Sequence, residues 1–246
     1  MLRAPAGTRQ DDGVTDLVLV HGAWHGAWCW ERVLPALRAA GHRVLVPTLP
    51  GLGERAEQLS PDITLDTHVA DVVSAVRAHR LTDVVLVGHS YAGMVVTGAA
   101  DRLDPVAALV YVDGAVPVPG ERWSDTNPPA LRAARRAEIA ETGVLAPPPA
   151  SVLGLAGADA AWVDGRQTPQ PGGVYDDPLA FDGRRWAALA RTYVACTRPA
   201  LASMDPSRER ARTQPGWDLV ELDTGHDPMI SAPGELTDVL LGVAAR

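Results

Sequence analysis

Short runs of β-branched and other apolar residues alternate along this chain with segments whose apolar residues recur at helical spacing. Continuous apolar runs joined by helical crossovers are typical of a parallel sheet that is covered on both faces. We therefore expect an α/β fold with about six mostly parallel strands and helices on both faces of the sheet. The predicted strands are 17–20, 43–46, 84–87, 107–112, 192–195 and 218–222, and the predicted helices are 30–40, 67–80, 92–103 and 234–245.

The alternation stops over residues 114–184. This segment contains a helical piece at 130–142, a proline triplet at 147–149, and scattered Trp, Gly and Pro residues. A structureless loop of this length is uncommon inside a compact domain, so the segment is better interpreted as an inserted lid or cap. We expect a flexible N-terminal segment (1–16), a core built from 17–113 and 185–246, and a helical lid insertion (114–184) over one end of the sheet.

Composition excludes several classes of protein. All 22 basic residues are Arg, which excludes Schiff-base, pyridoxal and P-loop NTPase chemistry, because each needs a lysine amine. The net charge of −8 disfavours nucleic acid as a partner. The chain shows no secretory signal, no apolar run near the roughly 18 residues that span a membrane, and only two cysteines, Cys29 and Cys196. We expect a soluble, cytoplasmic protein that binds neither nucleic acid nor membrane.

The strongest local signal is the sequence VVLVGHSYAG at 84–93. An apolar strand runs into a small-x-Ser-x-small turn and then into a helix, which is the arrangement that lifts a serine hydroxyl above a sheet as a nucleophile. The last small residue of the turn is Ala92 where Gly is usual. The alternative is that Gly88 and Ser90 only cap a helix. The strand and helix around the turn favour Ser90 as a nucleophile.

A second signal, His21-Gly22-Ala23-Trp24, directly follows the first predicted strand. Acyl transfer develops a negative oxygen that two backbone N–H groups can stabilise. In a strand–turn–helix site of this kind, one donor follows the nucleophile and the other lies in the loop after an earlier strand. Tyr91 and Ala23 are therefore the predicted oxyanion-hole donors, and an ordinary glycine turn at Gly22 is the alternative.

A third signal is Thr224-Gly225-His226, which follows the last predicted strand. The carboxyl ends of parallel strands meet at one edge of the sheet, where ligands bind in open α/β folds. A histidine at this edge can take the proton of Ser90, whose hydroxyl alone is a poor nucleophile. His226 is therefore the predicted general base.

These three motifs, in this order, resemble the α/β-hydrolase fold. More narrowly, the chain resembles the plant methylesterase and hydroxynitrile-lyase group and its bacterial esterase relatives. The resemblance implies a cofactor-free enzyme with a Ser–His–acid triad and a helical lid, and it covers nearly the whole chain outside 1–16 and the predicted lid. It rests on HGAWHGAW at 21–28, AGHRV at 40–44, GHSYAG at 88–93 and TGH at 224–226.

Two positions separate the chain from the lyase members of that group. The lyases carry Thr in place of Gly22 and a Lys just after the catalytic histidine, whereas this chain has Asp227-Pro228 there and no Lys anywhere. A carboxylate near a departing cyanide would repel it. We therefore expect ester hydrolysis rather than cyanohydrin cleavage.

The acid of the triad departs from the family pattern. The family usually carries an Asp three residues beyond the position of Cys196, where this chain has Pro199. Asp113 ends the predicted strand 107–112, where some α/β-hydrolases, such as certain haloalkane dehalogenases, carry the acid. Asp205 lies on the same loop as the usual acid but also stands where it could open a helix. A strand-end carboxylate is held rigidly, which favours Asp113 and leaves Asp205 as the alternative.

Aromatic side chains are candidates for the substrate site. Trp24 lies beside Gly22 in the predicted oxyanion loop, and both are expected to line the substrate. Trp162 and Trp186 lie in or beside the predicted lid, either as a roof over the substrate or as anchors of the lid. His21 and His25 have i, i+4 spacing, but position 22 is Gly rather than Glu, so we expect no metal and no cofactor.

The expected function is that of a serine hydrolase that cleaves carboxylic esters of small to medium apolar substrates through an acyl-enzyme. The same scaffold also supports a lyase, a cyclase or a tailoring thioesterase of a secondary pathway. A non-catalytic receptor is less favoured because it needs neither the nucleophile, nor the base, nor the oxyanion donors. The expected partner is a small-molecule ester, and the lid and the sheet edge leave a homodimer open.

Overall fold

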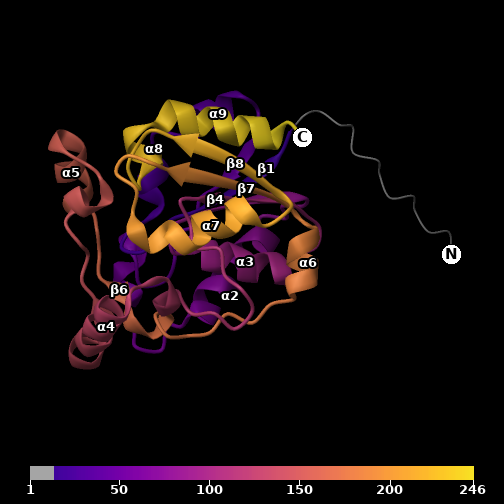
Figure 1. Ribbon diagram of the computed structural model, residues 1–246. Coiled ribbons are helices and arrows are strands. Elements are labelled where there is room, and N and C mark those ends of the chain that lie inside the picture. The colour runs from indigo at the N-terminus through magenta and orange to yellow at the C-terminus, as the bar shows by residue number, and fades with distance from the viewer. Residues whose placement is uncertain (1–13) are drawn as a thin grey trace.

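The centre of the molecule is a six-stranded sheet in the order β2-β1-β3-β4-β7-β8, and every neighbouring pair in it is parallel. The expected α/β fold is therefore confirmed. The computed structural model describes residues 14–246 (Figure 1). The strands are β1 (Asp16–Val20), β2 (Arg43–Leu45), β3 (Val84–His89), β4 (Val106–Val112), β7 (Ala190–Cys196) and β8 (Trp217–Leu222).

The N-terminal segment expected to be flexible lies mostly outside the described residues, at 1–13. Its last residue, Asp16, is not free but begins β1 and is 2% exposed. Asp16 accepts a hydrogen bond from the Thr82 amide and forms an ion pair with Arg43. These partners satisfy a buried carboxylate and fix the start of the first strand.

Helices cover both faces of the sheet, and alternate residues of each strand point to opposite faces. In β1, Leu17 and Leu19 pack in one apolar cluster, whereas Val18 and Val20 pack in the other. The first cluster contains α1 and α9, and the second contains α2 and α3. The helices of the core are α1 (Leu34–Ala39), α2 (Leu65–Ala78), α3 (Ala92–Arg102), α6 (Gly183–Ala188), α7 (Asp205–Thr213), α8 (Pro228–Ser231) and α9 (Pro233–Ala244).

Two predicted helices differ from the structure at their first residues. The helix expected at 30–40 begins at Leu34, with Pro35 in its first turn, and Ala27–Trp30 form a separate 3-10 turn that buries Trp28 and Trp30. The helix expected at 67–80 begins two residues earlier because Thr64 caps it through its side chain.

The insertion is only partly helical. It contains α4 (Pro129–Thr142), α5 (Gly157–Asp164) and a short antiparallel pair, β5 (Val144–Leu145) with β6 (Gln170–Pro171). In Figure 1 the arrowheads of β7 and β8 point toward the side where α4 and α5 lie, so the insertion stands at the carboxyl edge of the sheet. Its later residues Val174, Tyr175 and Leu179 are buried in the same cluster as α2 and α3, so this part belongs to the common core.

Within residues 14–246, none of the helices combines the length and the apolar character that a membrane crossing requires.

Candidate active site

Ser90 stands in the sharp turn between β3 and α3. Its φ of 53° lies in the left-handed region, which costs a non-glycine residue on the order of 1–3 kcal/mol and persists only when the surroundings hold it. The Ser90 carbonyl accepts hydrogen bonds from the amides of Gly93 and Ala115. A Cβ at Gly93 would lie 2.1 Å from the Ala115 carbonyl oxygen. The turn therefore depends on glycine at position 93. The small-x-Ser-x-small pattern, which covers only Gly88 to Ala92, does not include this requirement.

Ser90, His226 and Asp113 form a continuous chain of hydrogen bonds. His226 Nδ1 donates to Asp113 Oδ2 at 2.8 Å, since a carboxylate only accepts. In the neutral ring Nε2 is then free to accept from Ser90 Oγ, which lies 2.8 Å away. Ser90, Asp113 and His226 lie after the carboxyl ends of β3, β4 and β8. Their exposed fractions are 8%, 0% and 2%, in the same order. This geometry allows His226 to take the serine proton while Asp113 orients the ring.

Asp113 is held by more than His226. Its φ is 40°, and its Oδ1 accepts from the Cys196 amide at 3.4 Å and from Arg208 Nε at 3.2 Å. Arg208 Nη2 also reaches Asp113 Oδ2 at 3.3 Å. Arg208 is 3% exposed and comes from α7. Sequence reasoning missed Arg208, because nothing in the Arg-rich α7 pattern distinguishes it from exposed neighbours.

Asp205 does not contact His226. It begins α7, as its position before Pro206 suggested, and its Oδ1 accepts from Arg208 Nη1 at 2.6 Å. The two candidate acids are thus bridged by one guanidinium. Only Asp113 touches the histidine.

The loop after β1 lies directly against Ser90. A Cβ at Gly22 would lie 2.9 Å from Ser90 Cβ and 2.7 Å from His89 Nδ1, so only glycine fits between them. Ala23 is 2% exposed. Among the described residues, none accepts a hydrogen bond from the Ala23 or the Tyr91 amide. Two unpaired N–H groups beside a serine hydroxyl can receive a developing oxyanion.

Trp24 is locked in place by the insertion. Its φ is 64°, its amide donates to Gln170 Oε1 at 3.2 Å, and its carbonyl accepts from the Thr168 amide at 2.9 Å. Its indole Nε1 donates to the Leu145 carbonyl at 3.0 Å. The insertion therefore supports the backbone of the loop that carries Ala23.

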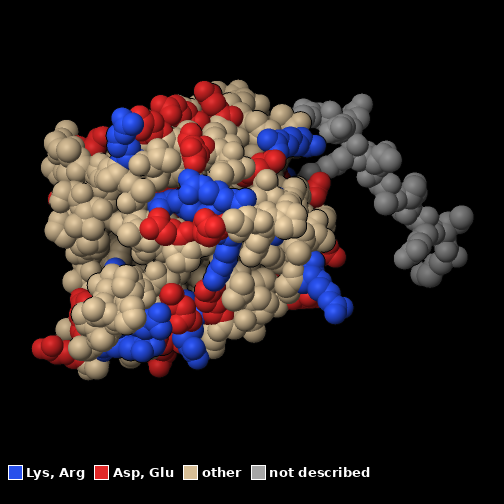
Figure 2. Space-filling model, in the orientation of Figure 1, with Lys and Arg blue, Asp and Glu red and all other residues tan. Residues whose placement is uncertain are grey.

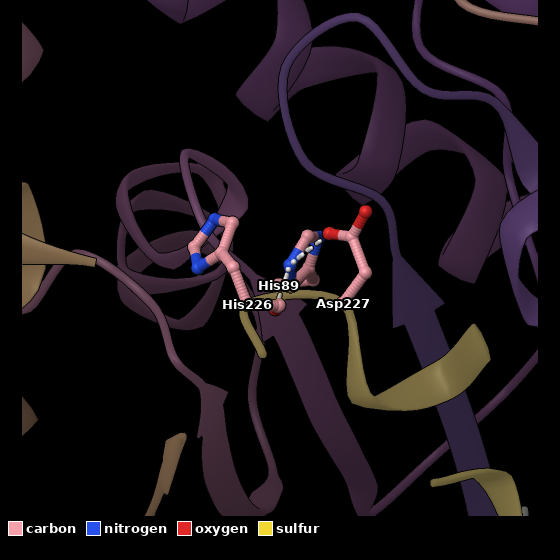
Figure 3. A group of neighbouring side chains, drawn as sticks. All are labelled: His89, His226 and Asp227. Atoms are coloured by element: carbon pink, nitrogen blue, oxygen red, sulfur yellow. Dashed lines mark hydrogen bonds and ion pairs between the residues drawn. The ribbon is translucent and has the colours of Figure 1, made fainter. Parts of the chain in front are cut away.

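A second buried polar cluster lies behind the first. The Asp227 carboxylate accepts from His25 Nε2 at 3.3 Å and lies 3.3 Å from His89 Nε2, and His89 Nε2 also donates to the His226 carbonyl at 2.9 Å. Figure 3 shows Asp227 beside the His89 ring, with the His226 ring on the other side of His89. His226 uses both ring nitrogens for Ser90 and Asp113, so His89, His226 and Asp227 form a hydrogen-bonded network rather than a set of free metal ligands.

Burial and charge act in opposite directions within this cluster. Burial raises the pKa of Asp227, but the charge and hydrogen bond of His25 outweigh it and bring that pKa down to about 2. Burial opposes protonation of His25, yet the attraction and hydrogen bond of Asp227 leave the His25 pKa raised above 6.5. For His89, burial and the neighbouring His226 lower the pKa well below 6.5. These directions favour a charged Asp227 paired with His25 and a neutral His89.

This pairing changes one argument drawn from the sequence. We expected Asp227 to disfavour cyanohydrin cleavage by repelling a departing anion. Asp227 is instead fully buried, and its carboxylate lies 3.3 Å from His25 Nε2, so it is not displayed toward a leaving group. The absence of lysine from the chain still separates it from the lyases.

A family model described as "Alpha/beta hydrolase family" matches residues 17–239. The chain belongs to the α/β-hydrolase family. The resemblance inferred from the three motifs is therefore confirmed, and the family match includes both the strand–turn–helix at Ser90 and the His226 loop.

Curated relatives of this α/β-hydrolase include several esterases. It is 39% identical to the carbendazim hydrolyzing esterase of Nocardioides sp. (strain SG-4G), over 92% of this chain and 98% of the relative. It is 30% identical to esterase PIR7B of Oryza sativa subsp. japonica, over 93% of this chain and 95% of the relative. These relatives place the chain in the esterase branch of the family.

Solved structures share the fold at lower identity. An extracellular α/β-hydrolase from a Paenibacillus species, described as sharing structural and functional homology with tobacco salicylic acid binding protein 2, superimposes with a TM-score of 0.82. The identity is 18%, and the match covers 93% of this chain and 98% of the other.

Trp162 and Trp186, expected either to cover the substrate or to anchor the lid, pack against other aromatic residues. The Trp186 indole donates to the Tyr111 hydroxyl at 2.8 Å and packs on Trp217, which begins β8. These contacts favour the alternative that Trp186 anchors the insertion to the core. The Trp162 ring packs edge-on against Trp28 at 5.1 Å between centroids, and Trp28 stacks on His25, so one ring separates Trp162 from the buried cluster.

Other aromatic residues lie closer to the site than those two. Trp123 of the insertion packs on Tyr91 with ring centroids 4.9 Å apart and meets Trp24 edge-on at 5.9 Å. The Arg135 guanidinium of α4 lies 5.4 Å from the Trp24 ring, 5.6 Å from Trp123 and 5.9 Å from Tyr175. Burial against these rings lowers the pKa of Arg135. Arg135 is therefore packed against the core rather than displayed on a solvated helix face.

The exterior carries mixed charges. Figure 2 shows arginines and acidic residues interspersed over the drawn face, which is also hollowed on the side of the insertion. No single-sign patch dominates that face.

Proposed function

We propose that this α/β-hydrolase is a serine carboxylesterase that works through an acyl-enzyme. Ser90 is the nucleophile, His226 the general base and acid, and Asp113 the group that orients His226. The observation that supports this most directly is the pair of 2.8 Å contacts on the two sides of the His226 ring.

In this mechanism Ser90 Oγ attacks the ester carbonyl carbon as His226 Nε2 takes its proton. The carbonyl oxygen becomes negative and is received by the amides of Ala23 and Tyr91, which have no other partner among the described residues. The tetrahedral species collapses, His226 returns the proton to the leaving alkoxide, and the alcohol departs. Water then attacks the acyl-enzyme, again with His226 as the base, and releases the acid.

We propose small to medium apolar esters as the substrates, with methyl esters first among them. The aromatic rings of Trp24 and Trp123 beside the oxyanion loop support an apolar substrate. The names of relatives support an ester bond: methylesterase 7 of Arabidopsis thaliana is 29% identical over 93% of this chain, and the 39% identical relative is named for carbendazim hydrolysis.

The test is hydrolysis of p-nitrophenyl acetate and butyrate, followed by a panel of methyl esters, thioesters, lactones and carbendazim. We expect turnover of the activated esters and of at least one methyl ester, with Ser90→Ala lowering kcat by about 10⁴-fold or more. A fluorophosphonate probe should label the wild type and the matched variant Ser151→Ala, but not Ser90→Ala. A folded protein that neither turns over esters nor takes the probe would refute the proposal and favour a receptor.

Activity on a thioester or a lyase substrate alone, still abolished by Ser90→Ala, would refute the carboxylesterase assignment while retaining the nucleophile. The substrate panel therefore separates a different reaction on the same residues from the absence of any reaction.

A further inference from the structure

His25 donates a hydrogen bond from each of its two ring nitrogens. Nδ1 lies 2.7 Å from the Ala23 carbonyl oxygen, and Nε2 lies 3.3 Å from Asp227 Oδ2. A carbonyl oxygen and an ionised carboxylate both accept only, so both nitrogens of His25 must carry a proton. These two contacts fit an imidazolium, although the residue is only 1% exposed.

Among the described residues, Asp227 is the carboxylate that contacts the His25 ring. Asp227 faces it from the loop before α8, and His89 faces it from the end of β3 with ring centroids 5.8 Å apart. The other groups nearby are His21 in the same loop, His226 beyond His89, and Glu54, whose carboxylate lies near Gly26. Burial keeps His21 neutral, since it lowers its pKa to about 3, and His89 is neutral for the same reason.

His25 connects the two loops that carry the site. Its Nδ1 bond ends on Ala23, whose amide is one proposed oxyanion donor, and its Nε2 bond ends on Asp227, the residue after His226. The peptide between Ala23 and Trp24 is held at both polar atoms, because its N–H donates to Gln170. The Ala23 N–H belongs to the preceding Gly22–Ala23 peptide, and holding the Ala23 carbonyl restricts that neighbouring peptide through the Cα that the two share.

We propose that His25, kept doubly protonated by Asp227, is a positioning residue that fixes the Ala23–Trp24 peptide of the oxyanion loop during ester hydrolysis. This inference rests on the proposed esterase function. It assigns a task to the second histidine of the HGAWHGAW motif and to Asp227, neither of which touches the substrate.

The protonation state has a direct test that needs no activity. Long-range ¹H–¹⁵N spectra of histidine-labelled protein at pH 7.5 should show one histidine with two protonated ring nitrogens. We expect that signal to be absent from His25→Gln. In Asp227→Asn, His25 should lose its second ring proton at a lower pH than in the wild type. No imidazolium in the wild type at this pH, or an imidazolium that persists in His25→Gln, would overturn the proposal.

Kinetics then test the positioning task. With the best ester from the panel, His25→Gln should lower kcat about 10- to 100-fold with KM changed less than about threefold, a smaller loss than that of a whole oxyanion donor because glutamine can still reach Ala23. In Asp227→Asn the alkaline limb of the kcat–pH profile should move to lower pH, which a merely structural role would not cause. The exposed His79→Gln is the matched control and should match the wild type.

The outcomes separate the two proposals. A wild type without esterase activity refutes the proposed function and leaves the spectra to decide the protonation of His25. An active wild type with an equally active His25→Gln, or with an unmoved alkaline limb in Asp227→Asn, refutes the positioning role alone.

Discussion

The Arg208 guanidinium lies against the Asp113 carboxylate at a place where the arginine side chain is 4% exposed and the carboxylate is fully buried. Asp113 therefore has partners on two sides, with His226 on one and Arg208 on the other. The arginine fixes the carboxylate so that one oxygen stays directed at the imidazole. It also reaches Asp205, the alternative acid, and so occupies the place in which that residue would have had to act.

Removing the Arg208 side chain should destabilise the fold. Arg208→Met leaves the Asp113 carboxylate buried without its cation, and breaking such a pair costs roughly 3–5 kcal/mol. Chemical denaturation at pH 7 measures this as a lower midpoint with an unchanged slope. Arg208→Lys, which retains the charge, should recover part of the loss. A Met variant within about 1 kcal/mol of the wild type would show that the pair contributes little.

The two candidate acids should separate cleanly in kinetics. Asp113→Asn is expected to lower kcat about 10³- to 10⁴-fold, because asparagine no longer holds His226 in the useful tautomer. Asp205→Asn removes only an interaction with Arg208 and should change kcat less than about fivefold. Circular dichroism of both variants checks that the fold persists. Near-full activity of Asp113→Asn would contradict the assignment of this residue.

Arg135 should attach α4 to the core. Its guanidinium packs over three aromatic rings, and contacts of this kind contribute about 0.5–2 kcal/mol. We expect Arg135→Ala to expose α4 to limited proteolysis and to raise KM, since two of the three rings flank the oxyanion loop. Arg136→Ala, which removes an exposed pair with Asp176 on the same helix, is the matched control. Equal cleavage of the two variants would contradict this anchoring role.

Stability should fall on mild acidification. Burial lowers the pKa of His21 to about 3 and of His68 to about 4, from 6.5. Between the folded pKa of each histidine and its unfolded pKa of 6.5, the unfolded chain binds a proton that the folded chain does not. The stability from these two histidines is therefore fully present above pH 6.5 and is lost as the pH falls toward the folded pKa. Each contributes about 1.4 kcal/mol per pH unit over its window.

Denaturation at pH 7 and pH 5 measures this loss. His68→Gln retains groups able to bond with the Pro50 carbonyl and the Tyr91 hydroxyl, the two partners of His68, but removes one titration. The free energy of unfolding of this variant should therefore depend less steeply on pH, by the contribution of one histidine. An unchanged dependence would show that His68 is not the titrating group.

Features specified by local sequence could be predicted. The turn at Ser90 is encoded by one strand, one small-residue turn and one helix, and Asp113 was singled out because it ends a strand. His226 was found because the carboxyl ends of parallel strands converge. In each case the residue is positioned by a strand of the sheet, and the strands can be predicted from the apolar pattern of the sequence.

Features that depend on distant side chains could not be predicted. Arg208 and Asp113 are 95 residues apart, and His25 and Asp227 are 202 residues apart, so no spacing rule links them. For a related reason, the position of Trp186 beside the predicted lid does not reveal that its indole donates to the hydroxyl of Tyr111, 75 residues away in the sequence. The sequence likewise does not show that the Asp227 carboxylate is buried beside His25.

The hydrogen bonds of Gln170 and Thr168 with the backbone of Trp24 join the insertion to the loop that carries Ala23, a proposed oxyanion donor. Grafting the insertion of another esterase onto this core would therefore replace these two hydrogen bonds along with the residues around the substrate. Chimeras that retain both residues should remain catalytically competent, whereas those that lose them should be folded but slow. In this branch, an exchange of the insertion is thereby tied to the support of the loop that carries Ala23.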